Sequence, residues 1–262
     1  MKKLAFIGLG NMGRAIASGL IRGGAVAAAD VRGYAPHWEK LSAYARETGI
    51  LACRSAEEAI ADADTVVLAV KPYVIEGVIA QLRGALAGKS VISVALGYNC
   101  ARLKPLLDET TRVQFVMPNT PALVGAGVML FEQENTLEAA ERAEIMEKFG
   151  ALGIVEELPA HLMGIGGAIS GCGPAFCAMV IEAMADAGVK YGLPRATAYR
   201  LASMTLSGTG QMQLGTGAHP GVIKDGVCSP AGTTIRGVEA LERAGLRAAM
   251  LDAVQAVMEK DV

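Results

Sequence analysis

The stretch Ile7-Gly8-Leu9-Gly10-Asn11-Met12-Gly13 decides the fold of this chain. It follows a short apolar run, Leu4-Ala5-Phe6-Ile7, which has the length and composition of a buried strand. It opens a segment with apolar residues at Met12, Ile16 and Leu20, a spacing typical of one helix face. A strand, a glycine turn and a helix in this order predict a dinucleotide-binding unit.

Each glycine of this stretch has its own physical role in such a unit. Gly8 is expected to make the tight turn, Gly10 to leave room for a pyrophosphate beside the backbone, and Gly13 to let helix and strand pack closely. The free N–H groups of the first helical turn then face the phosphate charge. Glycine is common in this chain, at 32 of 262 residues, so the flanking strand and helix carry the specificity of the motif.

The next apolar run, from Val26 to Ala29, is predicted to be the second strand, and it ends in Asp30. A carboxylate at that place accepts hydrogen bonds from both ribose hydroxyls of NAD. Arg32 lies two residues further on and would suit the 2′-phosphate of NADP instead. The pattern leaves NADH and NADPH both open as cofactors, with Asp30 favouring NADH.

Residues 1–159 alternate apolar runs of strand length with helical segments. Runs that are apolar throughout, such as 65–70 and 90–95, are typical of a parallel sheet covered on both faces. The alternation predicts an α/β, doubly wound sheet whose ligands bind beyond the carboxyl ends of the strands. The strand ends add these residues to the expected cofactor site: Ala69, Val70, Lys71, Pro72, Ala95 and Asn119. Asn119 lies in a stiff loop between two prolines and is a candidate ligand for a carboxamide.

Residues 160–262 are predicted to form a second, all-helical domain, because no strand-like run remains. Helices are expected at 161–169, 173–191, 194–214, 219–225 and 235–260. Apolar residues fall on more than one face of the second of these helices. A domain of this size cannot bury all of that surface internally, so we expect a second copy of the chain as partner, in a homodimer. Packing against the first domain alone is the alternative.

Composition excludes several classes of protein. The chain is 52% hydrophobic with a net charge of −2 and shows no basic stripe, so no nucleic-acid partner is expected. No apolar run reaches the length expected of a membrane span, so no membrane partner is expected. The five cysteines are odd in number and form no CxxC pair, and the three histidines lie far apart, so neither a disulfide framework nor a metal site is expected. Such cysteine usage fits a reducing cytoplasm.

A second chemical stretch lies at residues 227–235, which are small, rich in hydroxyl groups and followed by a helix. Backbone N–H groups at such a place bind an anion such as a carboxylate, and Ser229, Thr233 and Thr234 add hydroxyl donors. An ordinary helix cap by one of the two threonines explains the same residues. Ser170 and Gly171 belong to another small-residue loop, which lines the same cavity or makes a tight turn between helices.

The chain resembles the pyrroline-5-carboxylate reductase family, the last enzymes of proline biosynthesis, over nearly its whole length. The resemblance rests on residues 6–13, 69–72, 117–121, 169–176 and, above all, 219–234. It implies a Rossmann domain followed by a helical dimerisation domain, with dimers that often assemble into a decamer. It also implies hydride transfer from NADPH or NADH to the C=N carbon of L-1-pyrroline-5-carboxylate, which gives L-proline.

The resemblance implies roles for single residues as well. The loop from Ser229 through Gly232 and Thr233 is expected to hold the substrate carboxylate. Thr234 is expected to hydrogen-bond the ring nitrogen and is the candidate catalytic residue. Positions 69–72 and 94–96 are expected to contact the cofactor.

The chain departs from the family pattern at Asp30 and at Ser55-Ala56, where an asparagine is common, and both departures put an NADP preference in doubt. Cys172 and Ala231 replace the usual Ser and Gly without challenging the reaction. Three alternatives remain: a β-hydroxyacid dehydrogenase, another cyclic imine reductase, and a nucleotide sensor without turnover. Residues 164–173 lack the lysine that the first alternative needs, and the intact threonine pair argues against the last.

Overall fold

The computed structural model describes residues 3–259. The chain divides into two compact units, the first ending at Gly171 and the second beginning at Cys172. The division lies further along the chain than the boundary predicted between residues 159 and 160, inside a helical segment. We describe each unit by itself.

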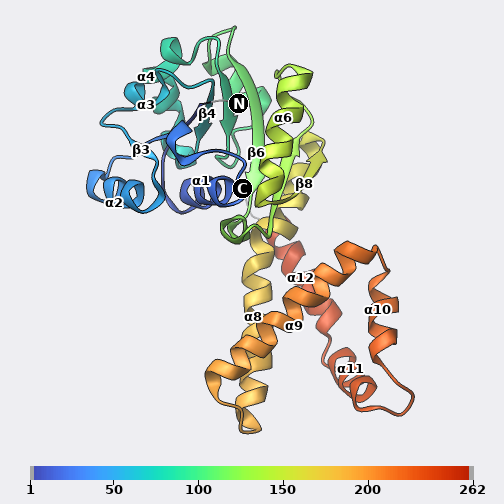
Figure 1. Ribbon diagram of the computed structural model, residues 1–262. Helices are drawn as coiled ribbons and strands as arrows, with labels where there is room; N and C mark the ends of the chain where they lie inside the picture. Colours follow the sequence, from blue (N-terminus) through green and yellow to red (C-terminus); the bar gives the residue numbers. More distant parts are fainter. Residues whose placement is uncertain (1–2, 260–262) are drawn as a thin grey trace. The chain divides into compact units, whose positions relative to one another are not determined.

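The first unit is built on an eight-stranded sheet in the order β3-β2-β1-β4-β5-β6-β7-β8 (Figure 1). All neighbouring strands are parallel except the pair β6 and β7. The strands are β1 (Leu4–Ile7), β2 (Val31–Tyr34), β3 (Leu51–Ala52), β4 (Thr65–Leu68), β5 (Ser90–Ser93), β6 (Arg112–Pro118), β7 (Gly127–Glu132) and β8 (Gly153–Leu158). The predicted doubly wound α/β fold is confirmed.

Helices cover both faces of this sheet. The α-helices of the first unit are α1 (Asn11–Arg22), α2 (Trp38–Thr48), α3 (Ala56–Ile60), α4 (Ile75–Leu86), α5 (Cys100–Leu103), α6 (Ala139–Phe149) and α7 (Met163–Gly167). Short 3-10 turns are η1 (Ala28–Asp30), η2 (Pro72–Val74), η3 (Lys104–Leu106), η4 (Thr120–Val124), η5 (Gly150–Leu152) and η6 (Ala160–Leu162), and η7 (Ala168–Cys172) is a π-helical turn.

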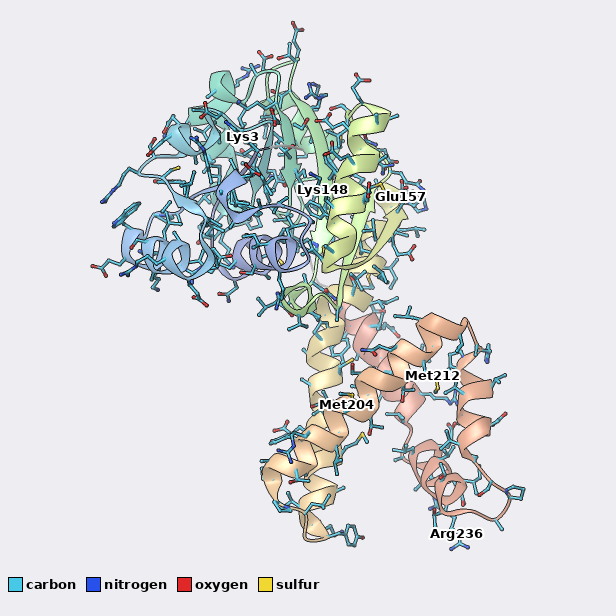
Figure 2. All side chains as sticks on the ribbon, in the orientation of Figure 1. Lys3, Lys148, Glu157, Met204, Met212 and Arg236 are labelled. Atoms are coloured by element: carbon cyan, nitrogen blue, oxygen red, sulfur yellow. The ribbon has the colours of Figure 1, made fainter. Side chains whose placement is uncertain are left out.

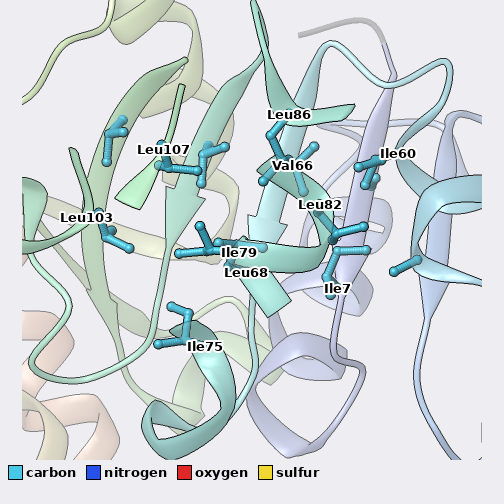
Figure 3. Close-up of a cluster of buried hydrophobic side chains, with 14 of the residues drawn as sticks. Ile7, Ile60, Val66, Leu68, Ile75, Ile79, Leu82, Leu86, Leu103 and Leu107 are labelled. Atoms are coloured by element: carbon cyan, nitrogen blue, oxygen red, sulfur yellow. The ribbon is translucent and has the colours of Figure 1, made fainter. Parts of the chain in front are cut away.

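The buried side chains form one core on each face. Successive side chains of a strand point to opposite faces, so Ile7 of β1 packs with α3, α4 and α5 in one core (Figure 3). Phe6 packs with α1, α2 and α6 in the other core. This two-sided burial explains why the strands read as continuous apolar runs in the sequence.

The second strand does not lie where the sequence analysis placed it. The run from Val26 to Ala29 leads into the 3-10 turn η1, and β2 begins only at Val31. Alanine has little preference for strands, whereas β2 itself contains the unpromising residues Arg32 and Gly33. A Cβ at Gly33 would lie 2.3 Å from Cδ1 of Leu9, so a larger residue there would force that leucine side chain to move. The two-residue strand β3 was not predicted either.

The second unit is all-helical, as predicted. Its helices are α8 (Gly173–Lys190), α9 (Arg195–Thr216), α10 (Pro220–Val227), α11 (Thr233–Arg243) and α12 (Leu246–Met258). The single helix predicted over 235–260 is in fact two, separated at Gly245, which has φ +75°. Within the described part of this unit the fully buried side chains are Ala185, Ala198 and Ala202.

Large apolar side chains of the second unit are exposed instead. Met204 and Met212 project from α9, with 71% and 46% of their surface exposed (Figure 2). The helical run 160–190 also has the length and mean hydropathy, 1.6, of a membrane span, contrary to the sequence expectation. One such helix is weak evidence for a membrane, because the core helix of a soluble protein or a signal sequence passes the same test.

Candidate cofactor and substrate site

In the glycine loop between β1 and α1, an added Cβ would clash with backbone atoms at two of the glycines but not at the third. Gly8 has φ +95°, and a Cβ there would lie 2.6 Å from the carbonyl oxygen of Ala69. A Cβ on Gly13 would lie 2.2 Å from the carbonyl oxygen of Gly8. A Cβ on Gly10 would meet no atom within 4 Å. The backbone of the loop therefore leaves space at Gly10, where a pyrophosphate has to approach, and the residues fit a dinucleotide.

The N-terminus of α1 is prepared for an anion. Gly10 is its N-cap, no side chain caps it, and its first turn carries no acidic residue. The N–H groups of Asn11 and Met12 therefore remain without a helical partner. Ile7 and Leu9 are buried and contribute only backbone to the loop. A phosphate at this end of α1 gains from these donors and from the helix dipole.

Arg14 braces this loop, a role that the sequence analysis missed. Its Nε donates to the carbonyl oxygen of Leu9 at 2.9 Å, and its Nη2 donates to the carbonyl oxygen of Lys40 at 2.9 Å. Its guanidinium carbon lies 5.0 Å from the ring centroid of Tyr44. The side chain thus ties the loop to α2 through two of its N–H donors.

Two further strand ends lie beside the glycine loop. The N–H of Ala69 donates to the carbonyl oxygen of Ile7 at 2.9 Å, and the N–H of Val94 donates to that of Leu68 at 3.1 Å. The parallel pairing thus continues past the ends of β4 and β5. It brings the following residues to the expected edge: Ala69, Val70, Lys71, Pro72 and Ala95. Their contact with the cofactor stays a prediction.

Asp30 and Arg32 lie away from this edge, and the predictions built on them are wrong. Asp30 precedes β2 and therefore lies at the amino edge of the sheet, opposite the glycine loop. Arg32 lies inside β2, and its Nη2 pairs with Oδ2 of Asp62 at 2.8 Å. Neither side chain can read the ribose, so Asp30 gives no reason to favour NADH.

Asn119 is committed to the fold rather than to a carboxamide ligand. Its Oδ1 accepts from the N–H of Val128 at 2.8 Å, and its Nδ2 donates to the carbonyl oxygen of Ser170 at 2.8 Å. Ser170 donates its own hydroxyl to the carbonyl oxygen of Gly166 at 2.9 Å. Asn119 and Ser170 are both buried, which contradicts their prediction as ligand donors. Gly171 is exposed, and a Cβ there would meet no atom within 4 Å.

The loop before α11 has the donors that a carboxylate needs. Gly232 is the N-cap, no side chain caps the helix, and its first turn holds no acidic residue. Thr233 and Thr234 are therefore the first two helical residues and not caps, which excludes the ordinary-cap interpretation. Both are exposed, and within residues 3–259 neither hydroxyl is engaged in a hydrogen bond.

The conformation of this loop is tightly set. The N–H of Gly232 donates to the carbonyl oxygen of Ser229 at 3.0 Å. A Cβ on Gly232 would lie 2.4 Å from Oγ of Ser229 and 3.0 Å from its carbonyl oxygen, so a larger residue there would displace the serine hydroxyl. Ala231 has φ +60°, a conformation that costs an L side chain about 1 kcal/mol or more. Upstream, Nδ1 of His219 accepts from the N–H of Gly221 at 3.0 Å and caps α10, which gives that histidine a structural role.

Burial and charge shift few of the pKa values near these loops. Burial raises the pKa of the Cys100 thiol, and Glu132 adds to the effect. Burial also raises the pKa of Glu132, whose Oε2 accepts from the N–H of Cys100 at 2.8 Å. Among the described residues, no group of three or more His, Cys, Asp or Glu side chains is placed to hold a metal ion.

Comparisons with known proteins agree with this arrangement. Residues 160–262 match the family model described as pyrroline-5-carboxylate reductase dimerisation, and residues 3–97 match that described as NADP oxidoreductase, coenzyme F420-dependent. The chain is 43% identical to a pyrroline-5-carboxylate reductase of Treponema pallidum, over 97% of this chain and 98% of that protein. It is 40% identical to that of Escherichia coli, over 99% and 97%.

Solved structures point the same way. The pyrroline carboxylate reductase of Plasmodium falciparum with NADP bound has a TM-score of 0.86 at 32% identity, covering 98% of this chain and 96% of that one. That of Coxiella burnetii has a TM-score of 0.89 at 30% identity, covering 99% and 97%. A 3-hydroxyisobutyrate dehydrogenase of Mycobacterium tuberculosis, at 19% identity and a TM-score of 0.53, shares the fold alone. On these matches and on its glycine and threonine loops, the chain belongs to the pyrroline-5-carboxylate reductase family.

Proposed function

We propose that this chain reduces L-1-pyrroline-5-carboxylate to L-proline. The nicotinamide cofactor supplies the hydride, which goes to the carbon of the C=N bond. The observation that carries the proposal is the loop 229–234 at the start of α11. In a chain of this family, it presents hydroxyl and N–H donors that have no hydrogen-bond partner among the described residues. A β-hydroxyacid dehydrogenase and a sensor without turnover have no comparable support.

The first task of the chain is to hold the substrate carboxylate. The N–H groups of the first turn of α11 point toward the loop, and no acidic residue of that turn competes for them. The hydroxyls of Ser229 and Thr233 add donors at the same place. Hydrogen bonds to an ionised carboxylate are short and strong, so this loop fixes the orientation of the ring.

The second task is to place the ring nitrogen beside a proton donor. Thr234 carries the hydroxyl for this role and acts as donor or relay rather than as nucleophile. An imine is basic enough to arrive already protonated, so the reaction needs no strong general acid. Orientation of the two reactants supplies most of the rate, since good positioning is worth roughly 7–11 kcal/mol.

We propose NADPH as the preferred cofactor. The carboxyl end of β2 is Tyr34, followed by Ala35, Pro36 and His37, and none of these is a carboxylate that would bind the free ribose hydroxyls of NAD. The NADP oxidoreductase family model and the NADP-bound structure of the Plasmodium relative support the same choice.

The assembly and location are part of the proposal. The exposed apolar residues of the second unit, together with the dimerisation family model, support a homodimer formed through that unit. Dimers of this family often assemble into decamers, and sedimentation of the full chain tests for both species. The five cysteines are free thiols, which supports a reducing cytoplasm, and cell fractionation tests that location.

Product analysis tests the proposed reaction. The purified chain is incubated with NADPH and pyrroline-5-carboxylate, and proline is quantified by mass spectrometry against the NADPH consumed. We expect one proline for each NADPH. Oxidation of a β-hydroxyacid with NADP, or binding of NADPH without any proline formed, would contradict the proposal.

A further inference from the structure

Arg54 lies on the same sheet edge as the glycine loop. The register pairs Gly33 of β2 with Ala52 of β3, and the N–H of Cys53 donates to the carbonyl oxygen of Gly33 at 2.9 Å. On the other side of β2, the N–H of Gly8 donates to the carbonyl oxygen of Tyr34 at 2.9 Å. Neighbouring strands lie about 4.8 Å apart. Arg54 therefore lies two strand spacings, roughly 10 Å, from Gly8 along this edge. In such folds the adenosine extends from the glycine loop toward the end of the second strand.

The side chain of Arg54 is held in place by an aromatic ring. Its guanidinium carbon lies 3.5 Å from the ring centroid of Trp38, at the start of α2. Its backbone is fixed as well, because its N–H donates to Oε2 of Glu58 at 2.6 Å and Ser55 caps α3. Stacking on a ring orients the plane of the guanidinium before any ligand arrives.

The N–H groups of the Arg54 guanidinium are free to bind a ligand. Within the described part of the chain, Arg54 makes no side-chain hydrogen bond and no ion pair. Arg14, the other arginine close to the glycine loop, uses its donors on two carbonyl oxygens. Arg54 is thus the arginine at this edge whose guanidinium has a fixed orientation and N–H groups free for a ligand.

A phosphate monoester fits such a group better than a hydroxyl does. Arginine binds phosphate through two parallel hydrogen bonds, and the doubly charged phosphate gains from each of them. Three carboxylates belong to the same segments: Glu58 accepts from the N–H of Arg54, Glu57 accepts from Nε2 of Gln81 at 2.6 Å, and Glu39 lies in the first turn of α2. None of them makes an ion pair with Arg54 among the described residues. In the same turn of α2, exposed Lys40 adds a positive charge next to exposed Glu39.

We propose that Arg54, stacked on Trp38, binds the 2′-phosphate of the cofactor and so selects NADPH over NADH. The proposal rests on the proposed function, which supplies a nicotinamide cofactor. It assigns specificity to residues that the sequence pattern alone did not identify.

Binding of two fragments tests the assignment without turnover. Trp38 is the only tryptophan of the chain, so its fluorescence reports directly on ligands at this edge. We compare 2′,5′-ADP with 5′-AMP on the full chain, by fluorescence and by calorimetry. The wild type should bind 2′,5′-ADP about tenfold more tightly or better, and Arg54→Gln should lose that difference while its affinity for 5′-AMP is unchanged.

A matched control separates charge from position. Arg46→Gln removes an equal charge from the last turn of α2, and it should bind both fragments as the wild type does. Among the described residues, the side chain of Arg46 makes one hydrogen bond, from Nε to the carbonyl oxygen of Ser42 at 3.4 Å. Arg54→Lys keeps the charge without the paired N–H groups of the guanidinium. It should recover part of the difference in affinity between 2′,5′-ADP and 5′-AMP. Retention of full discrimination by Arg54→Gln, or an equal loss of affinity for both fragments, would overturn the proposal.

Kinetics distinguish this proposal from the proposed reaction. In Arg54→Gln, KM for NADPH should rise about tenfold, with kcat and the NADH parameters unchanged. If the wild type discriminates between the fragments through Arg54 but does not reduce the imine, the proposed reaction fails and Arg54 keeps its role. If the imine is reduced and Arg54→Gln leaves KM for NADPH unchanged, the role of Arg54 alone fails.

Discussion

The side-chain amide of Asn119 donates a hydrogen bond of 2.8 Å to the carbonyl oxygen of Ser170 and so joins the end of β6 to the π-helical turn η7. The same side chain accepts a hydrogen bond of 2.8 Å from the N–H of Val128 at β7. Asn119 is only 6% exposed, so it has little contact with solvent or with a ligand. Its role is to hold three segments of the first unit together.

Asn119→Ala should therefore destabilise the protein. It leaves the partly buried N–H of Val128 and the buried carbonyl oxygen of Ser170 without their partner. A buried unpaired group costs about 1–3 kcal/mol. Urea unfolding measures the change in the free energy of unfolding. Gln133→Ala removes an exposed amide side chain that makes no hydrogen bond among the described residues, and it should change this free energy by less than about 0.5 kcal/mol. A variant at Asn119 with wild-type stability and weakened cofactor binding would restore the ligand role.

Two glycines of the motif should respond differently to alanine. In Gly13→Ala the new Cβ meets the carbonyl oxygen of Gly8 at 2.2 Å, so the loop has to move, and both stability and cofactor binding should fall. In Gly10→Ala the Cβ meets no protein atom within 4 Å, so stability should stay near that of the wild type while NADPH binding weakens about tenfold or more. Thermal unfolding and NADPH titration measure the two effects. Equal loss of stability in both variants would contradict this assignment of space at Gly10.

Thr234→Ala should lower kcat with little change in NADPH affinity. The hydroxyl acts on the ring nitrogen, and positioned proton transfer is typically worth about 10²–10⁴-fold in rate. Thr234→Ser keeps the hydroxyl and should retain most of the rate. Steady-state kinetics with varied imine measure the effect, and an unchanged kcat in Thr234→Ala would remove Thr234 from the mechanism.

Ala231 should tolerate glycine and resist a branched side chain. At φ +60° glycine relieves the strain of the Cβ, but it also makes the unfolded chain more flexible, so Ala231→Gly should lie within about 1 kcal/mol of the wild type. Ala231→Val should be destabilising, because branching at Cβ disfavours a positive φ. Chemical unfolding of both variants gives the comparison, and equal stability of the two would contradict the strained loop.

Glu132 should make stability depend on pH. Burial is the main cause that raises the pKa of this carboxyl, and Glu134 adds to it, although the N–H of Cys100 and the side chain of Asn99 act in the opposite direction. The folded state therefore keeps the proton after the unfolded state has lost it, and the free energy of unfolding falls as pH rises through that interval. Glu132→Gln retains an acceptor for Cys100 and cannot ionise, so its stability relative to the wild type should increase from pH 4 to pH 7. Parallel pH profiles of the two proteins would contradict the raised pKa.

Local signals were enough to predict the elements that carry the cofactor loop. The spacing of the glycines at positions 8, 10 and 13 was enough to predict the loop, because each glycine has a separate steric role in it. Ser55 was predictable as a cap of α3 by the same local logic, and the N–H of Glu58 donates to its Oγ at 3.1 Å. Such features depend on residues three or four apart.

Features that depend on distant residues could not be predicted in this way. In β2, the side chain of Leu9 fills the space beside Gly33, and Arg32 pairs with Asp62. The apolar run 26–29 looked more like a strand, which moved Asp30 to the wrong edge of the sheet. Likewise, the contact between Arg54 and the ring of Trp38 joins the loop after β3 to the start of α2, and no local sequence pattern predicts it.

The central claim is tested most directly by the initial rate of NADPH oxidation with and without pyrroline-5-carboxylate, measured beside the same pair of assays with NADH. We predict oxidation that depends on the imine, with a higher kcat/KM for NADPH than for NADH. Oxidation of neither cofactor by a folded chain that still binds 2′,5′-ADP would contradict the reductase assignment.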